Sequence, residues 1–201
     1  MRPKRGDWQA GDACLSLRTV IDRRLAACFV LTVVGAAAIL AAMGRPLLCQ
    51  CGYLDLWGQV GPEQSQMLAD WYSPSHVIHG LLFYAALRFV PGWSERRRFC
   101  VALGAETAWE MVENTPWIID RYREATAALG YSGDSIVNSL SDIAMMAAGY
   151  ALARRLPVWA SVALLIALEL VALAAVRDNL TLNVWMLLFP TDFIRDWQAG
   201  A

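Results

Sequence analysis

Acidic side chains and histidines recur at helical spacing inside apolar stretches of this sequence. Within each of three groups the members are three or four residues apart, so each group lies along one face of a helix. The groups are His76 and His79; Glu106, Glu110 and Glu113; and Asp134, Asn138 and Asp142. A carboxylate deep in an apolar medium costs on the order of 3 kcal/mol. The three faces are therefore expected to turn toward one another around a shared polar site.

Imidazole nitrogens and carboxylate oxygens are ligands that Zn, Mn and Fe accept in proteins. A cation would also relieve the repulsion between Glu110 and Glu113, which lie one helical turn apart. The predicted metal ligands are His76, His79, Glu110, Glu113, Asp134 and Asp142. The alternative is that one carboxyl group holds a proton and works as a general acid or base. Under either hypothesis the predicted catalytic residues are Glu110, Glu113 and Asp142.

Two arginines and one amide are predicted to bind substrate. Arg121 and Arg123 follow Asp120 in a short polar run, and guanidinium groups make paired hydrogen bonds to phosphates or carboxylates. Asn138 lies on the same predicted face as Asp142. A purely structural role remains open for these three residues and for Asp134. The arginines could anchor on anionic lipid headgroups, Asn138 could hydrogen-bond between helices, and Asp134 could cap a helix.

The composition indicates that these faces lie in a membrane protein. The chain has 201 residues, of which 57% are hydrophobic and 17% charged. Soluble domains have roughly 45–50% apolar and about 25% charged residues. These values exclude an ordinary cytosolic enzyme and a disordered chain, and five cysteines are too few for a disulfide-built secreted module. A net charge of -1 gives no field for nucleic acid, so the expected partners are membrane lipids.

Five apolar segments of about the length of a membrane span must position the polar groups. They are residues 25–43, 76–90, 99–119, 136–153 and 158–176. A sixth segment, residues 180–189, is too short to cross and is expected to be a re-entrant or interfacial helix, or part of a longer sixth span. The predicted fold is an all-α bundle of membrane-spanning helices. Residues 1–24 form a cytoplasmic tail and residues 25–201 form one domain.

The distribution of Lys and Arg predicts the orientation in the bilayer. Twelve of these residues fall in the N-terminal tail and in the connections after the second and fourth segments, against four on the opposite side. The bias places the N-terminus in the cytoplasm of a bacterial cell, with the chain in the inner membrane. The polar groups then converge near the periplasmic face. A cleaved signal peptide at 25–43 is the alternative, which the long charged region before it disfavours.

The cysteines suggest no catalytic role. Cys49 and Cys51 lie in the first outer loop, where they could form a disulfide or bind a soft metal. Cys14, Cys28 and Cys100 lie in the tail or in predicted spans and are expected to be inert.

Seven strings between about residues 45 and 197 carry a family resemblance. They are Cys51-Gly52-Tyr53, Asp70-Trp71-Tyr72, His76-Val77-Ile78-His79-Gly80, Trp109 through Asn114, Ile119 through Thr126, Gly133-Asp134-Ser135 and Arg177 through Asn183. Together they resemble an uncharacterised family of bacterial multi-pass inner-membrane proteins. The resemblance implies a membrane location and supplies no activity.

A looser similarity is to the YjdF-type inner-membrane proteins. These have a His near a Gly on one helix, Glu-x-x-Glu on the next, and three Asp at four-residue spacing on a third. The matching residues here are His76 or His79 with Gly80, Glu110 and Glu113, and Asp134 and Asp142. Asn138 stands where that pattern has its middle Asp, which removes one anionic ligand.

Three functions fit these observations. The first is a metal-assisted hydrolase or transferase that acts on a lipid-linked substrate. The second is a structural or assembly protein in which the acids only hold the helices together. The third is a transporter of ions or small solutes, which the apolar inner halves of the segments and the lack of an internal repeat disfavour.

Overall fold

Every regular element of the described chain is helical. The computed structural model describes residues 23–126 and 130–200, and contains no strand within them. The predicted cytoplasmic tail, with Cys14, lies almost wholly outside these residues. The helices are α1 (Arg23–Ala42), α2 (Ser73–Leu87), α3 (Glu95–Glu113), α4 (Pro116–Ala125), α5 (Ile136–Arg155), α6 (Val158–Val176), α7 (Leu180–Leu188) and α8 (Asp192–Ala199), with a short 3-10 turn, η1, at Gln64–Gln66.

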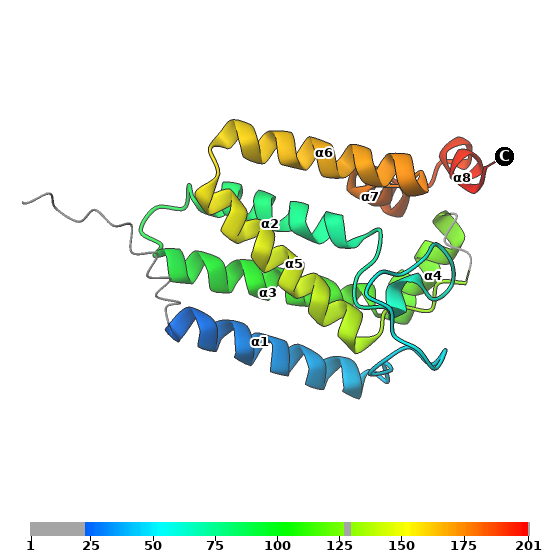
Figure 1. Ribbon diagram of the computed structural model, residues 1–201, viewed down its shortest axis with the longest axis horizontal. Helices are drawn as coiled ribbons and strands as arrows, with labels where there is room; N and C mark the ends of the chain where they lie inside the picture. The colour runs from blue at the N-terminus through cyan, green and yellow to red at the C-terminus, as the bar shows by residue number, and fades with distance from the viewer. Residues whose placement is uncertain (1–22, 127–129, 201) are drawn as a thin grey trace, which may run out of the picture.

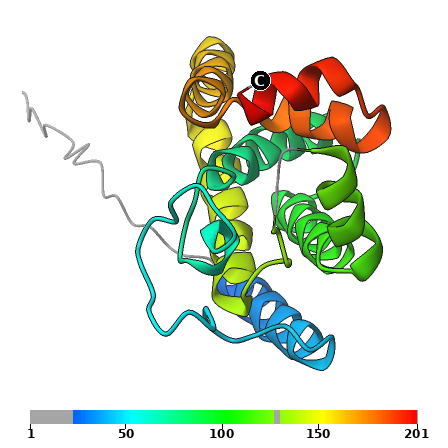
Figure 2. The ribbon, with the colours of Figure 1, turned by 90° about the vertical axis from the view of Figure 1, so that its right-hand side faces the viewer.

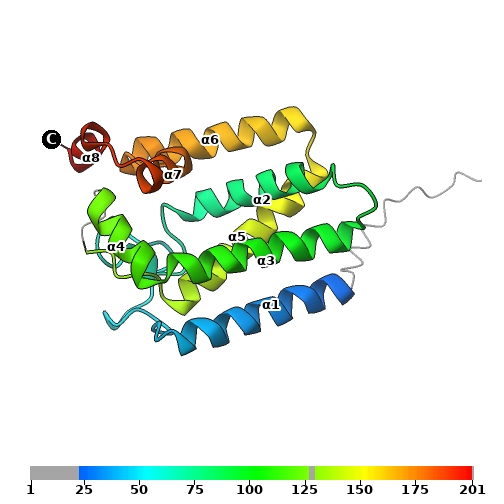
Figure 3. The same cartoon turned by 180° about the vertical axis from the view of Figure 1, so that it is seen from behind.

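The five long helices form a bundle with two unlike ends (Figure 1). Helices α1, α2, α3 and α6 run roughly side by side, and α5 crosses them obliquely, as the opposite view confirms (Figure 3). One end, here called the loop end, carries the long connection 43–72 together with α4, α7 and α8 (Figure 2). Of the described residues, the other end carries the short turns 88–94 and 156–157 between the helices. All three predicted polar groups therefore lie in or near the half of the bundle toward the loop end.

Three described helices are long and apolar enough to cross a membrane: Leu25–Ala42 of α1, Ile136–Arg155 (α5) and Val158–Val176 (α6). Only 6% of the α6 window is buried inside the protein, against 50% for α5. Val162, Ile166 and Leu170 lie one turn apart on α6 and are each at least half exposed. Helix α6 thus presents an apolar face outward, whereas α5 lies at the centre of the bundle. The predicted count of five spans stays a prediction, because α2 has only 15 residues and α3 carries several charges.

The predicted segment 99–119 is two helices instead of one. Helix α3 ends at Glu113, and α4 begins again at Pro116 after a turn. Proline lacks the amide hydrogen that a continuing helix needs, but it fits the first position of a new one. The Thr115 hydroxyl accepts a hydrogen bond from the Ile118 amide and caps α4. This break leaves Asn114 and α4 at the loop end, where they help to enclose the polar site.

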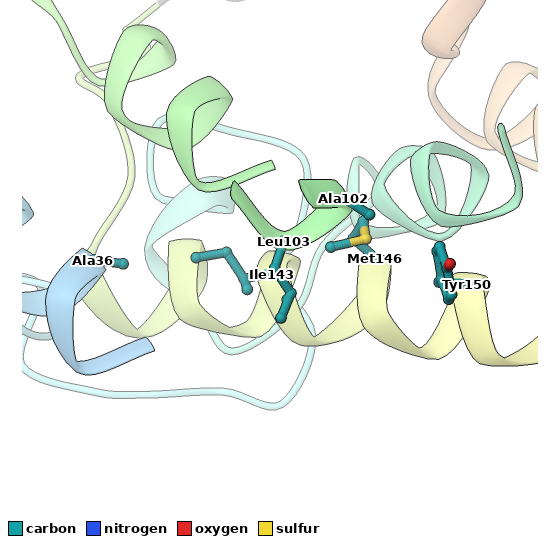
Figure 4. Close-up of a cluster of buried hydrophobic side chains, with 6 residues drawn as sticks. All are labelled: Ala36, Ala102, Leu103, Ile143, Met146 and Tyr150. Atoms are coloured by element: carbon teal, nitrogen blue, oxygen red, sulfur yellow. The ribbon is translucent and has the colours of Figure 1, made fainter. Parts of the chain in front are cut away.

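Two facing glycines set the distance between α2 and α5. A Cβ on Gly80 would overlap the backbone of Met146 and Tyr150, and a Cβ on Gly149 would overlap the carbonyl of Val77. The two backbones therefore cross in direct contact. Beside this crossing, α5 packs against α1 and α3 through a cluster of fully buried side chains (Figure 4). The cluster consists of Ala36, Ala102, Leu103, Ile143, Met146 and Tyr150.

Four of the cysteines are paired. Cys28 of α1 is joined to Cys100 of α3, with their Cα atoms 6.4 Å apart. These two cysteines, which were expected to be inert, are thus joined to each other. Cys49 is joined to Cys51 in the connection 43–72, with a Cα separation of 5.2 Å. The first pair ties α1 to the helix that carries the glutamates.

The glycine contact predicts a large asymmetry among alanine substitutions. Gly80→Ala or Gly149→Ala is expected to destabilise the protein by about 1–3 kcal/mol, because the added methyl group meets backbone that has no room to move. Gly104→Ala is the matched control, since a Cβ there meets nothing within 4 Å. Thermal unfolding in detergent micelles measures the difference. Equal midpoints for all three variants would contradict the close crossing.

Candidate functional site

One glutamate joins the two histidines. Glu106 is 0% exposed, and its carboxylate oxygens lie 2.6 Å from Nδ1 of His76 and 3.0 Å from Nδ1 of His79. Helical spacing makes this possible, because His76 and His79 lie on one face of α2 and meet Glu106 on α3. A carboxylate accepts hydrogen bonds only, so both imidazoles donate through Nδ1. This arrangement leaves Nε2 of each ring available to another group.

Two further carboxylates approach His76. Oε1 of Glu110 lies 3.5 Å from Nδ1 of His76, and Oδ2 of Asp142 lies 3.7 Å from its Nε2. Asp142 also accepts a hydrogen bond from the hydroxyl of Ser73, at 3.0 Å. Glu110 differs from its neighbours because it is fully buried and neither of its carboxylate oxygens has a hydrogen-bond partner among the residues that the structure describes. A buried carboxylate in this condition requires a proton or a cation.

The start of α2 is held by an acid that was not predicted. The side chain of Asp70 accepts hydrogen bonds from the amides of Tyr72 and Ser73, at 2.6 and 3.1 Å. Amides at the beginning of a helix have no acceptor within the helix, and that of Ser73 also reaches the carbonyl of Asp70, at 3.3 Å. Asp70 therefore fixes the first turn of α2, and with it the hydroxyl that reaches Asp142. Its place two residues before Tyr72, ahead of Pro74, is the sequence signal that could have indicated this role.

Asp134 is bonded to neutral donors at the edge of the site. Its carboxylate accepts hydrogen bonds from Asn114, at 2.7 Å, and from the hydroxyl of Tyr131, at 3.0 Å. Burial raises the pKa of Asp134 to about 6, and the bond from Asn114 partly offsets this effect. The helix cap is the neighbouring Ser135, whose hydroxyl accepts from the amide of Asn138. The suggestion that Asp134 itself caps the helix was wrong.

A cavity of about 190 Å³ joins most of these groups. Its lining includes six of the predicted residues: His76, His79, Glu113, Asp134, Asn138 and Asp142. Tyr72, Trp109, Tyr122 and Tyr131 add aromatic surface, and Leu180, Asn183 and Val184 of α7 form another wall. No Lys or Arg belongs to the lining that the structure describes. The cavity therefore suits a cation, or a neutral group, much better than a free anion.

The predicted substrate-binding arginines lie away from this lining. Arg121 donates two hydrogen bonds to the carbonyl of Leu187, at 2.8 and 3.0 Å, and so ties α4 to α7. Arg123 donates to the carbonyl of Tyr131 at 2.5 Å and pairs with Asp120 at 3.4 Å. Asn138 does line the cavity, although its amide nitrogen donates to the carbonyl of Met67. Substrate binding by these three residues stays a prediction.

The described residues contain three groups whose donor atoms lie close enough to hold a metal ion. They are His76, Glu110 and Glu113; His76, His79 and Glu106; and Cys49, Cys51 and Glu63. Four of the six predicted ligands, His76, His79, Glu110 and Glu113, belong to these groups, whereas Asp134 and Asp142 belong to none of them. Glu106 was missed as a site residue, although the sequence shows that it lies one turn before Glu110 on the same helical face.

The geometry predicts where both imidazoles carry a proton. In metal-free protein with ¹⁵N-labelled histidine, two Nδ1–H signals are expected. An amide offers one acceptor oxygen, and its nitrogen must donate to the other ring, so Glu106→Gln should leave one Nδ1–H signal. Glu124→Gln, at an exposed position of α4, is the matched control and should leave both. Two Nδ1–H signals in the Glu106→Gln spectrum would contradict the bridge.

A second acid at the loop end predicts a pH dependence. Burial raises the pKa of Asp178 to about 6, against which the hydrogen bonds from Tyr72 and the Asn179 amide act. The carboxyl of Asp178 loses its proton at about pH 4 in the unfolded chain and only at about pH 6 in the folded protein. Its contribution to the unfolding free energy is therefore fully present below about pH 4 and is lost as the pH rises to about 6. The unfolding free energy of the protein, relative to that of Asp178→Asn, should fall by about 3 kcal/mol over this interval and stay flat above it. A constant difference across the interval would contradict the shifted pKa.

Comparison with known proteins agrees with the expected resemblance. Residues 40–200 match the family described as "Protein of unknown function (DUF2585)". A UPF0314 protein of Sphingopyxis alaskensis is 54% identical over 82% of this chain and 89% of its own length. A UPF0314 protein of Paracoccus denitrificans is 50% identical over 92% of this chain and 99% of its own length. UPF0314 protein R03235 of Rhizobium meliloti is 50% identical over 89% of this chain and 94% of its own length.

No solved structure matches the chain. The matched region covers α2 through α8 and so contains the whole histidine and carboxylate cluster. These bacterial relatives are uncharacterised, and the looser likeness to YjdF-type proteins stays a prediction. This chain belongs to the DUF2585 family, which includes the UPF0314 proteins.

Proposed function

We propose that this protein is an integral inner-membrane protein crossed by α1, α2, α3, α5 and α6, with its N-terminus in the cytoplasm. The outward apolar faces of α1 and α6 support contact with lipid. The short turns between α2 and α3 and between α5 and α6 carry or adjoin Arg96, Arg97, Arg98, Arg154 and Arg155. Positive charge at this end favours the cytoplasmic side, and the loop end then faces the periplasm.

The proposed activity rests on a divalent cation bound beside His76. The ligands are one nitrogen of His76 and the carboxylates of Glu110 and Glu113, whose donor atoms all lie within 4.8 Å of one another. Ligands around a tetrahedral zinc ion are roughly 3.4 Å apart, so modest side-chain movement closes the site. Asp142, 3.7 Å from Nε2 on the other side of the His76 ring, would be a third carboxylate beside the cation. The observation that supports the cation most directly is that both buried carboxylate oxygens of Glu110 lack a hydrogen-bond partner within the described part of the chain.

Other residues of the cluster orient the proposed metal ligands. Glu106 accepts from both histidines and fixes the planes of the rings, as outer carboxylates do at metal sites. Ser73 holds Asp142 from the start of α2. With one face of His76 pinned by Glu106, the open side of the cluster faces the cavity. An incoming group there meets carboxylates, hydroxyls and the two imidazoles, and no Lys or Arg side chain in the lining that the structure describes.

The proposed reaction is metal-assisted hydrolysis or group transfer on a lipid-linked substrate. A bound divalent cation would activate water and stabilise developing negative charge. Glu113 and Asp142 line the cavity and are placed to take or return a proton at the attacking oxygen. Leu180 and Val184 make one wall apolar, which suits the first part of a lipid chain. Because the described lining contains no Lys or Arg, the favoured substrate is one whose reacting headgroup is uncharged or is neutralised by the cation.

Elemental analysis of detergent-purified protein tests the cation. We expect near-stoichiometric Zn, Mn or Fe in the native protein and almost complete loss in Glu110→Ala combined with Glu113→Ala. Removing two of the proposed ligands also removes like charges that repel without a cation, so the metal-free variant should keep its fold. Glu124→Ala is the matched control, because Glu124 is an exposed carboxylate on α4, and its metal content should equal that of the native protein.

The opposite result is equally informative. If neither protein contains metal after purification without chelators, and the double variant only unfolds at a lower temperature, the cation proposal is wrong. The acids then serve to hold α2, α3 and α5 together, as in a structural or assembly protein.

A further inference from the structure

A second cavity lies beside the first at the loop end. Its volume is about 160 Å³, far more than the roughly 15 Å³ that one water molecule needs. Ser65, Tyr72 and Tyr131 line both cavities, so these three side chains form a common wall. The exposed turn at Val60 and Gly61 forms its outer side. A ligand at the surface of the loop end could therefore reach this cavity without passing the histidine cluster.

The one carboxylate in this cavity already has donors. Asp178 accepts from the hydroxyl of Tyr72 at 3.0 Å, from the amide of Asn179 at 2.9 Å and from the side chain of Gln198 at 3.0 Å. These groups are neutral, and each satisfies part of the carboxylate. Asp178 thus holds the side chains of Tyr72 and Gln198 in place through these hydrogen bonds.

Two glutamines offer the hydrogen-bonding capacity that remains. Gln64 is 8% exposed, lines the cavity, and its side chain makes no hydrogen bond with any other described residue. Oε1 of Gln198 is fully buried and has no hydrogen-bond partner among the described residues. A buried amide oxygen without a partner costs free energy. The Gln64 and Gln198 side chains line the same cavity, one from η1 and the other from α8. Their free atoms include donors on Gln64 and an acceptor on Gln198.

This combination selects one class of ligand. An anion would meet Asp178 with no Lys or Arg in the described lining. An ammonium group only donates, so it cannot accept from the amide nitrogen of Gln64. A hydroxyl group both donates and accepts, and several hydroxyls on one ring can satisfy both glutamines together. The aromatic side chains of Tyr72 and Tyr131 add the flat apolar surface against which a sugar ring packs.

We propose that the second cavity binds an uncharged sugar, and that Gln64 and Gln198 are the residues that hydrogen-bond to its hydroxyl groups. The cavity adjoins the proposed cation site across Tyr72, so the sugar forms part of the lipid-linked headgroup. This last link rests on the proposed function, whereas sugar binding itself does not. The shared wall places the sugar beside the reacting group, which identifies the substrate class as a glycosylated lipid.

Binding of methyl β-D-glucoside tests the proposal. Full-length protein in a polyoxyethylene detergent, which contains no sugar, is studied by saturation-transfer NMR over millimolar concentrations. We expect saturable binding, with a Kd about tenfold higher in Gln64→Ala and in Gln198→Ala, because each loses hydrogen bonds to the ligand. Gln59→Ala is the matched control, since Gln59 is an exposed glutamine of the same connection, and its Kd should not change.

Two comparisons make the outcome decisive. Choline and inorganic phosphate are added as competitors, and neither should displace the glucoside. No saturable glucoside binding, binding unchanged in both glutamine variants, or displacement by choline would each overturn the proposal. The same titration on Glu110→Ala combined with Glu113→Ala separates the two proposals. Sugar binding that persists there, whether or not the native protein holds metal, supports the sugar site independently of the cation site.

Discussion

The buried carboxylate of Glu106 is the constraint on which the arrangement of the bundle depends. A fully buried charge is costly unless donors surround it, and the only histidines in the chain supply them. Because both donors lie on α2 and the acceptor on α3, the pair fixes the relative height of these helices. Glu110 follows one turn later, and this height places it beside His76. The single bridge thus determines which other acids can share the site.

Close approach of α5 is the second requirement. Asp142 reaches His76 because the backbones of α2 and α5 meet without intervening side chains at Gly80 and Gly149. A larger residue at either glycine would separate the helices by about the width of a methyl group. The hydrogen bond between Ser73 and Asp142 could then not keep its length of 3.0 Å. Helix packing in the apolar half of the molecule therefore controls the geometry of the polar half.

The sequence predicted the bundle and the convergence of its acids, because helical spacing alone shows which residues share a face. His76, Glu110 and Asp142 could be chosen in this way. The bridging role of Glu106 could not, because it depends on the relative height of two helices, which no local pattern encodes. The second cavity was also missed, since Gln64 and Gln198 are 134 positions apart in the chain and neither lies on an apolar face. Pro116 is visible in the sequence as a possible helix break, but the apolar residues on both sides of it led to the prediction of one continuous segment, 99–119.

The long connection 43–72 belongs to the site and does more than link α1 to α2. Its carbonyl groups at Pro46, Leu47 and Ser65 accept hydrogen bonds from the amides of Ile136, Val137 and Ser135 at the start of α5. These amides would otherwise lack partners, so the connection caps the helix that carries Asp142. Connections of this length without much regular structure are usually functional. The same segment supplies Ser65 to both cavities and Gln64 to the second, so the contacts that cap α5 also position the walls of the cavities.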